Sequence, residues 1–327
     1  SLQMSVSFFD VVGWICFAIV VIEIILWFVR VCNPKEQNNK RSTPPTAKFQ
    51  YCYWENKDRM WMYYNHWESP TPAKALVFIC HGICEHSGRY AAIAHKMNEA
   101  GYSVYAMDHR GHGQSDGYRN YINSMRDVIG DACDFITFIH NSRPMLPVFV
   151  MGHSMGGMIA INVTHRLASF VRGGVFSAPA LMIDPVLMKY RPIVSFLQSF
   201  MPKFVVSRLA PGAMCHDPVV IEQYCYDILN TPGVKKPVPA RTALQLVLGI
   251  EDAIACEKDF ATPFLLMQGT EDSVCLPKGA ETFFGTAVSE DKEYKEWKGS
   301  YHEIMNEDNG MEVVSYAIDW INRHLVA

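Results

Sequence analysis

Five short apolar runs, each closed by a polar or glycine-bearing turn, constrain the fold of this chain more than any other feature. Segments of helical period lie between them, such as residues 89–100 and 125–141. Fully apolar strands that alternate with helices indicate a parallel sheet covered on both faces. The runs are ALVFICHG from Ala75, YSVYAMDHRG from Tyr102, PVFVMGHS from Pro147, GGVFSAP from Gly173 and PFLLMQGTED from Pro263.

Two further segments complete this pattern. Residues 48–54 and 59–67 alternate and carry many aromatic side chains, which predicts an opening antiparallel pair of strands. In open sheets of this kind, chemistry gathers beyond the carboxyl ends of the strands. The polar turns that close the apolar runs are therefore expected to share one edge of the sheet.

Residues from about 179 to 239 break the rhythm and offer no obvious sheet strand. This insertion predicts a helical cap. Its apolar residues at helical spacing either pack down on the body as a roof or lie partly exposed to lipid, with basic residues at the headgroups. The apolar residues are Ile193, Phe196, Phe200 and Phe204, and the basic ones are Lys189, Arg191, Lys203 and Arg208.

The segment VFVMGHSMGGMIA, residues 148–160, places Ser154 between Gly152 and Gly156 where a strand is expected to become a helix. This is the pattern of a nucleophile elbow, in which a strained turn projects a serine hydroxyl from the sheet edge. Small neighbours keep such a turn free of clashes. The N–H groups of the following helix suit a negative charge that develops at the site.

A serine hydroxyl needs a base, and the base needs an orienting acid. In this architecture the partners follow in the order serine, acid, histidine. Asp272 lies just past a predicted strand, with Glu271 as the competing acid, and His302 lies on a loop after the probable last strand. We therefore predict that Ser154, Asp272 and His302 form a catalytic triad.

An oxyanion hole is expected from the backbone N–H of Met155 and that of Ile83, in the loop after an earlier strand. His153 is expected to brace the elbow or touch substrate. His109 and His112 more plausibly shape a turn than bind metal, because zinc requires three or four converging ligands. No metal or organic cofactor is required by this site.

Residues 11–29, VVGWICFAIVVIEIILWFV, match the length of a membrane-spanning helix. Glu23 costs about 2.5 to 3.5 kcal/mol there, which the many Val, Ile, Leu and Phe residues outweigh. A cleaved signal peptide is the alternative, although no basic residue precedes the run. We predict an anchor over 1–32, a flexible linker over 33–47 and the main domain over 48–327. Basic residues after the run predict a single-pass membrane protein whose main domain faces the cytosol.

The charge and cysteine content exclude other classes. The net charge of -4 offers no basic footprint for nucleic acid. The ten cysteines are scattered along a chain rich in apolar residues, which favours free thiols over a disulfide framework.

Several blocks together resemble the monoacylglycerol lipase family of α/β-hydrolases: HGICEHSGRY, DHRGHGQSDG, GHSMGG, LLMQGTEDSVCLPKGA and GSYHE. The resemblance runs from about Ala75 to the C-terminus. It implies an α/β-hydrolase fold with a mostly parallel eight-stranded sheet, helices on both faces and a helical cap. It also implies hydrolysis of monoacylglycerols to glycerol and fatty acid, and it matches the triad and oxyanion donors named above.

The resemblance further implies that Glu85, Arg89 and Tyr224 line the polar end of the substrate site, although Glu85 and Arg89 could instead brace the loop as an ion pair. Cys275 matches a cysteine near the glycerol pocket. One departure is Met305, which stands where family members carry a second histidine that assists at the headgroup.

The expected activity is therefore that of a membrane-anchored serine hydrolase acting on a lipid ester. Membrane contact is expected through the N-terminal helix, and the cap is a second candidate for it. The departure at Met305 keeps a lysophospholipase, or a broader carboxylesterase or acyl-thioesterase, as the alternative. A lipid-binding receptor without turnover is the third hypothesis, and the complete triad argues against it.

Overall fold

The computed structural model describes residues 19–23, 52–182, 188–230 and 236–325. Its centre is an eight-stranded sheet of order β1-β2-β4-β3-β5-β6-β9-β10. From β4 to β10 neighbouring strands are parallel, whereas β2 is antiparallel to β1 and β4. The predicted mostly parallel α/β-hydrolase sheet is confirmed. The strands are β1 (Tyr53–Glu55), β2 (Trp61–Trp67), β3 (Ala75–Cys80), β4 (Tyr102–Met107), β5 (Val148–His153), β6 (Val171–Ser177), β9 (Phe264–Gly269) and β10 (Lys292–Trp297).

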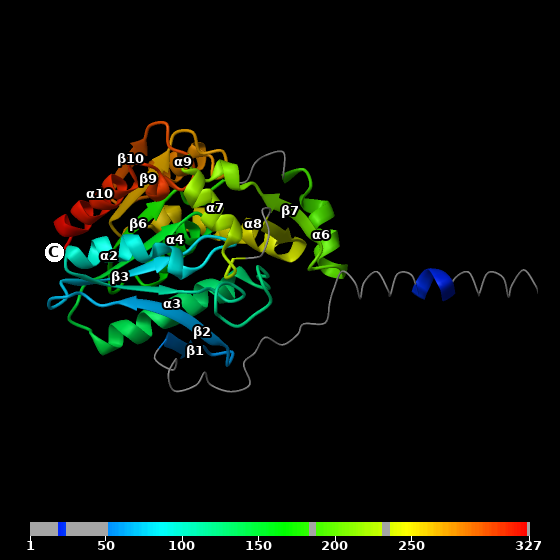
Figure 1. The fold of residues 1–327 in the computed structure, drawn as a ribbon, viewed down its shortest axis with the longest axis horizontal. Coiled ribbons are helices and arrows are strands. Elements are labelled where there is room, and N and C mark those ends of the chain that lie inside the picture. The colour runs from blue at the N-terminus through cyan, green and yellow to red at the C-terminus, as the bar shows by residue number, and fades with distance from the viewer. Residues whose placement is uncertain (1–18, 24–51, 183–187, 231–235, 326–327) are drawn as a thin grey trace, which may run out of the picture.

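Helices cover both faces of this sheet (Figure 1). One face packs against α2 (Ala91–Glu99) and α10 (Gly310–Arg323). The other packs against α3 (Met125–Ser142), α4 (Met155–Arg166), α8 (Ala240–Ala255) and α9 (Pro277–Thr286). The short 3₁₀ helices of the body are η2 (Ser87–Tyr90), η4 (Cys256–Asp259) and η5 (Ile304–Asn306).

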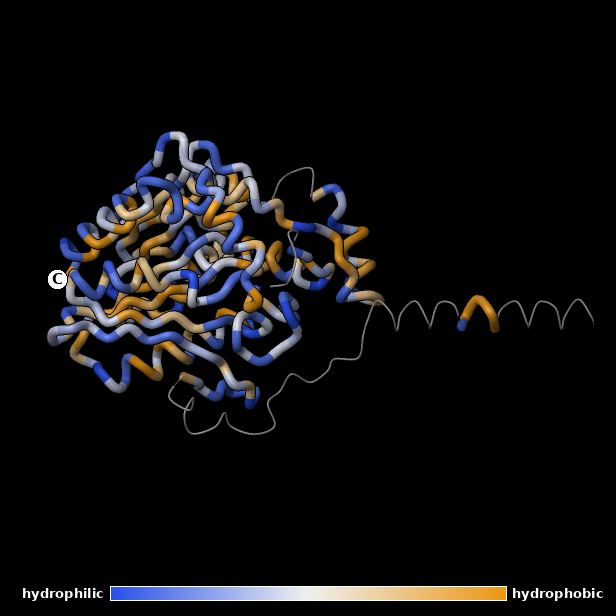
Figure 2. The backbone as a smooth tube through the Cα atoms, viewed as in Figure 1, coloured by the Kyte–Doolittle hydropathy of each residue, from blue (hydrophilic) through white to orange (hydrophobic). Residues whose placement is uncertain are grey.

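Strand β3 shows why the central strands read as continuous apolar runs. Its residues Leu76 and Phe78 join the core beneath α3 and α4, whereas Val77 and Ile79 join the core beneath α2 and α10. Successive side chains of a strand point to opposite faces, so burial on both faces requires an apolar residue at every position. Figure 2 shows the resulting apolar strands in the interior of the body.

Between β6 and α8 the chain forms a separate group of elements, which we call the cap. They are α6 (Arg191–Phe200), β7 (Val205–Leu209), η3 (Pro211–Ala213), α7 (Pro218–Tyr226) and β8 (Lys236–Pro239). The sequence predicts no strand here, yet β7 and β8 form an antiparallel pair. Strand β8 contains Pro237 and Pro239, and prolines are rare in strands except at edges. The sequence of β8 therefore does not predict a strand. A pair of two strands consists only of edges.

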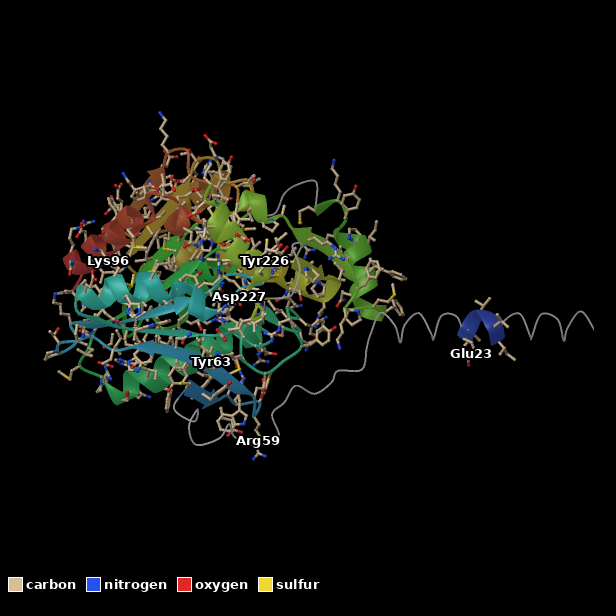
Figure 3. All side chains as sticks on the ribbon, viewed as in Figure 1. Glu23, Arg59, Tyr63, Lys96, Tyr226 and Asp227 are labelled. Atoms are coloured by element: carbon tan, nitrogen blue, oxygen red, sulfur yellow. The ribbon has the colours of Figure 1, made fainter. Side chains whose placement is uncertain are left out.

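The prediction of a single-pass membrane protein is wrong by the structural evidence. Over the described parts of the chain, none of the helices combines the length and the apolar character needed to cross a bilayer. Of the predicted spanning helix at 11–29, the structure describes residues 19–23, which are helical and include Glu23 (Figure 3). A span requires about 20 helical residues. The rest of the segment, and the linker at 33–47, lie outside the described residues.

Candidate active site

The strand-to-helix turn at Ser154 has the strained geometry that the glycine pattern predicts. Ser154 lies between β5 and α4 with φ 58° and ψ -122°. A non-glycine residue at positive φ of this kind costs about 1 to 3 kcal/mol. The Ser154 N–H donates to the carbonyl of Ser177 at the end of β6 (3.0 Å), which helps to hold the turn. The Ser154 hydroxyl contacts the thiol of Cys275, with Oγ and Sγ 3.9 Å apart.

Gly152 and Gly156 are required by close backbone contacts. A Cβ atom on Gly152 would lie 2.1 Å from the carbonyl oxygen of Gly156. A Cβ atom on Gly156 would lie 2.0 Å from the carbonyl oxygen of Cys80, at the end of β3. Both distances are far below van der Waals contact, so α4 can start this close to the sheet only with glycine at these two positions.

Asp272 and His302 meet although 30 residues separate them. Asp272 follows β9, and His302 follows β10, the neighbouring strand in the sheet. Nδ1 of His302 lies 2.8 Å from Oδ2 of Asp272, and both side chains are almost fully buried. Glu271, the competing acid in the sequence, is exposed. The structure therefore brings together His302 and Asp272.

The Asp272 carboxylate is held in its charged form. Oδ1 accepts hydrogen bonds from the N–H groups of Val274 (2.8 Å) and Cys275 (2.9 Å), and Oδ2 accepts one from Nε2 of Gln268 (2.9 Å). Burial alone raises the pKa of Asp272, but the His302 contact and these N–H donors outweigh it and hold the pKa below its ordinary value.

Ser154 and His302 line one small cavity, of about 30 Å³, beneath the cap. The body contributes Ile83 and His153 to its wall. The cap contributes an apolar roof, and this roof encloses the carboxyl-end edge of the sheet at which the sequence predicts the chemistry. The roof residues are Leu209, Met214 and Tyr224.

The two predicted oxyanion donors flank this cavity. Met155 is the first residue of α4, so its N–H is one of the unpaired donors at the positive end of a helix. Ile83 lies in the loop after β3 and lines the cavity beside Ser154. Backbone N–H groups in such positions stabilise negative charge without moving during reaction.

Glu85 and Arg89 bind one another. An Arg89 guanidinium nitrogen lies 2.5 Å from Oε2 of Glu85, and the ring of Tyr224 lies 4.8 Å from the Arg89 Cζ atom. His153 lies against His302, with ring centroids 4.6 Å apart. Burial, and then the neighbouring His302, lower the pKa of His153 to about 4. Glu85, His153 and Tyr224 line the cavity, and Arg89 lies behind Glu85, so the polar groups of Glu85 and Arg89 bind one another inside the protein.

Contacts with the cap hold the loop that carries His302. The N–H of Glu303 donates to the carbonyl of Met214 (2.6 Å). The backbone N–H of His216 donates to Oε2 of Glu307 (3.0 Å), and Nδ1 of His216 lies 3.0 Å from the same oxygen. The ring of His216 lies against that of Tyr301. A further contact joins Nε2 of His86 to Asp227 at the end of α7 (2.7 Å).

Sequence reasoning missed two polar residues beside the triad. Gln268 is the last but one residue of β9 and binds Asp272 from within the strand. Glu303 directly follows His302 and is bound by Arg89. The sequence shows that Gln268 and Glu303 lie close to motif residues. It does not predict that Gln268 binds Asp272 or that Glu303 binds Arg89.

Three histidines are packed together behind the Ile83 loop. The ring of His81 lies 4.2 Å from that of His109 and 5.4 Å from that of His112. Burial, reinforced by repulsion between the rings, lowers the pKa of His81 well below its ordinary value and that of His109 to about 3. Burial also lowers the pKa of His112 to about 4.

We expect these histidines to make the protein acid-sensitive. The unfolded chain binds protons below about pH 6.5, where the folded state leaves the three rings neutral, so stability falls as the pH drops from 6.5 toward 4. Each histidine costs on the order of 2 kcal/mol at pH 5. Thermal unfolding between pH 7.5 and 5 measures this loss. His109→Gln should flatten the pH slope, whereas His165→Gln, at a half-exposed site, should not; equal slopes would contradict the assignment.

The fold and this site define a serine hydrolase of the α/β-hydrolase class. The family model described as serine aminopeptidase, S33, matches residues 71–309. Human monoglyceride lipase is 31% identical over 83% of this chain and 90% of its own length, and the mouse monoglyceride lipase is 28% identical over 89% and 97%. The crystal structure of Paleococcus ferrophilus monoacylglycerol lipase matches with a TM-score of 0.71 at 28% identity, over 80% of this chain and 99% of its own. The chain belongs to the monoacylglycerol lipase family.

Proposed function

We propose that this enzyme hydrolyses monoacylglycerols to glycerol and free fatty acid. Ser154 Oγ attacks the ester carbonyl carbon while Nε2 of His302 takes the hydroxyl proton and passes it to the leaving glycerol oxygen. The N–H groups of Ile83 and Met155 stabilise the oxyanion. Water, activated by His302, then attacks the acyl-enzyme and releases the fatty acid.

The contact between His302 and Asp272 is the observation that carries this proposal. A carboxylate on Nδ1 keeps the proton on that nitrogen, so the lone pair of Nε2 is available to accept the Ser154 proton. The same carboxylate stabilises the imidazolium that forms. The reaction requires the Ser154 hydroxyl to turn from Cys275 toward His302, which lines the same cavity. Apo sites of this class commonly show the serine contact loosened in this way.

A lysophospholipase or a broader esterase is the second candidate, and Met305 favours it. This residue is buried beside Ile93 and His153, so the wall of the polar end includes a thioether where a histidine is expected. A wall without that donor reduces discrimination between glycerol and other headgroups.

A substrate panel tests both candidates. Purified protein should release oleate from 2-oleoylglycerol with a kcat/KM at least 10-fold above that for oleoyl-lysophosphatidylcholine and an oleoyl thioester, and a fluorophosphonate should label it at Ser154. Equal or higher turnover of lysophosphatidylcholine would replace the first candidate with the second. Absence of both labelling and turnover would contradict serine hydrolysis at this site.

The cap also supports delivery of the substrate from a lipid surface. No residue of α6 is buried, and Ile193, Phe196 and Phe200 are 57%, 64% and 59% exposed at helical spacing. Exposed Arg208 and Lys189 lie in the flanking segments. An apolar helix face between basic residues is typical of a helix that lies in the headgroup region of a bilayer.

Replacing Phe196 and Phe200 together with serine should weaken binding to anionic phospholipid vesicles by about 10-fold or more, because both rings lose burial in the acyl region. Sedimentation with vesicles measures the partition. Turnover of a soluble p-nitrophenyl ester should stay within twofold. Phe138→Ser, which changes a phenylalanine of similar exposure on α3, serves as the control. Equal vesicle binding by all three proteins would contradict this role of the cap.

A further inference from the structure

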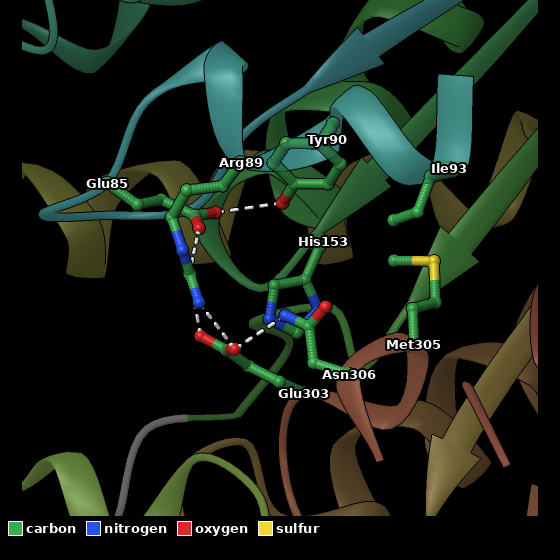
Figure 4. A pocket seen from close by; sticks show the side chains of 8 residues that line it. All are labelled: Glu85, Arg89, Tyr90, Ile93, His153, Glu303, Met305 and Asn306. Atoms are coloured by element: carbon green, nitrogen blue, oxygen red, sulfur yellow. Dashed lines mark hydrogen bonds and ion pairs between the residues drawn. The ribbon is translucent and has the colours of Figure 1, made fainter. Parts of the chain in front are cut away.

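A buried carboxylate directly follows the proposed base. Glu303 is 5% exposed, and its carboxylate faces inward beside His153 (Figure 4). Two guanidinium nitrogens of Arg89 lie 2.9 and 2.8 Å from its two oxygens, and Nδ2 of Asn306 donates to it at 2.7 Å. This paired geometry is the most directional that an arginine and a carboxylate form.

The same guanidinium reaches the opposite wall of the site. Arg89 also binds Glu85, whose second oxygen accepts hydrogen bonds from the Tyr90 hydroxyl (2.8 Å) and from the N–H of Gly82. Gly82 directly precedes Ile83, the proposed oxyanion donor. Figure 4 shows Arg89 between the two carboxylates. One side chain therefore joins the Ile83 loop to the His302 loop, across 214 residues of sequence.

We infer that Glu303 is a positioning residue, which holds His302 in register with the oxyanion donors by way of Arg89. The inference rests on the proposed function, because it assigns a role within the same site. In an acyl transfer, the base and the oxyanion donors must act on the same carbonyl group. A displacement of either by about 1 Å costs about 100-fold in rate. The link fixes this relation, because Nη1 of Arg89 binds both Glu85 and Glu303 while Nη2 binds the second oxygen of Glu303.

The charges explain why the link is rigid. Burial raises the pKa of Glu303, but Arg89 outweighs it and holds the pKa well below its ordinary value, so the carboxylate stays ionised at neutral pH. The Tyr224 ring covers the guanidinium from the cap side. With its charge paired to two carboxylates, Arg89 has little to gain from rotating toward solvent or substrate.

Two ester substrates separate positioning from headgroup binding. Glu303→Gln keeps the shape of the side chain and removes its charge. We expect kcat to fall 10- to 100-fold on both 2-oleoylglycerol and p-nitrophenyl butyrate, with KM within threefold and the melting temperature within a few degrees. A loss confined to KM for 2-oleoylglycerol would assign Glu303 to headgroup binding instead. A lower melting temperature with unchanged kcat per labelled active site would make it merely structural.

Controls keep the outcome tied to this one inference. Glu296→Gln, on the exposed side of β10, should behave as wild type. Should Glu303→Gln fail to fold, Asn306→Ala removes one donor and leaves both charges, and kcat should then fall about three- to tenfold on both esters. If Ser154→Ala is inactive and both Glu303→Gln and Asn306→Ala match wild type, the inference is wrong and the proposed function stands. If wild type hydrolyses neither ester, the proposed function fails first.

Discussion

Replacing Ser154 with alanine is expected to lower kcat for 2-oleoylglycerol by about 10⁴- to 10⁶-fold, the loss typical of removing a serine nucleophile. The acyl-enzyme cannot form without Oγ, and only the oxyanion donors and substrate binding remain. The removed atom lies 3.9 Å from the Cys275 thiol, a weak contact, so the protein should keep its melting temperature. Fatty-acid release and fluorophosphonate labelling of the purified protein measure the two consequences.

Ser315→Ala provides a matched control for this change. Ser315 lies on α10, and its hydroxyl donates to the carbonyl of Met311 at the exposed surface. It should keep full activity and full labelling. Fatty-acid release by Ser154→Ala within 10-fold of wild type would show that another group attacks the ester. Cys275 is a poor candidate, because burial and then the charge of Asp272 raise the pKa of its thiol.

Replacing Asp272 with asparagine is expected to lower kcat by about 10⁴-fold. The amide keeps the size of the side chain but presents no charge to the imidazolium, and it favours the tautomer of His302 that cannot accept the Ser154 proton. The effect should fall on kcat more than on KM, because the change acts on the transition state. Initial rates on a soluble ester, measured against substrate concentration, separate the two constants.

Glu271→Gln distinguishes this role from a general loss of negative charge. The two acids are adjacent, yet Glu271 is exposed and Asp272 contacts His302. Glu271→Gln should stay within twofold of wild type. A comparable loss in both variants would mean that the charge of the loop, and not the contact with His302, supports the reaction.

The sequence predicts the sheet and the loops of the site for one physical reason. Strands that are buried on both faces consist mainly of apolar residues. The sequence therefore predicts that a strand ends near the point where His81, Gly152 or Asp272 interrupts the apolar pattern. Parallel strands bring such ends to one edge, so residues distant in sequence are expected together without any knowledge of side-chain contacts.

Other features depend on contacts that no local pattern contains. Arg89 and Glu303 pair across 214 residues of sequence, and either residue could equally have been a solvent-exposed charge. The strand β8 contains two prolines, which local propensity counts against a strand, and only its pairing with β7 defines it. The membrane prediction relied on the apolar run and on the basic residues that follow it, and these describe the composition of a segment.

The small cavity beneath the cap has a consequence for the rate at which substrate enters the site. A space of about 30 Å³ accommodates a water molecule or two. Leu209, Met214 and Tyr224 roof this space, so we expect them to move before a fatty ester is admitted. Gated entry of this kind runs on microsecond to millisecond timescales and often limits throughput. Solvent viscosity and acyl-chain bulk would then govern the pace of the cycle more than the chemistry at the serine.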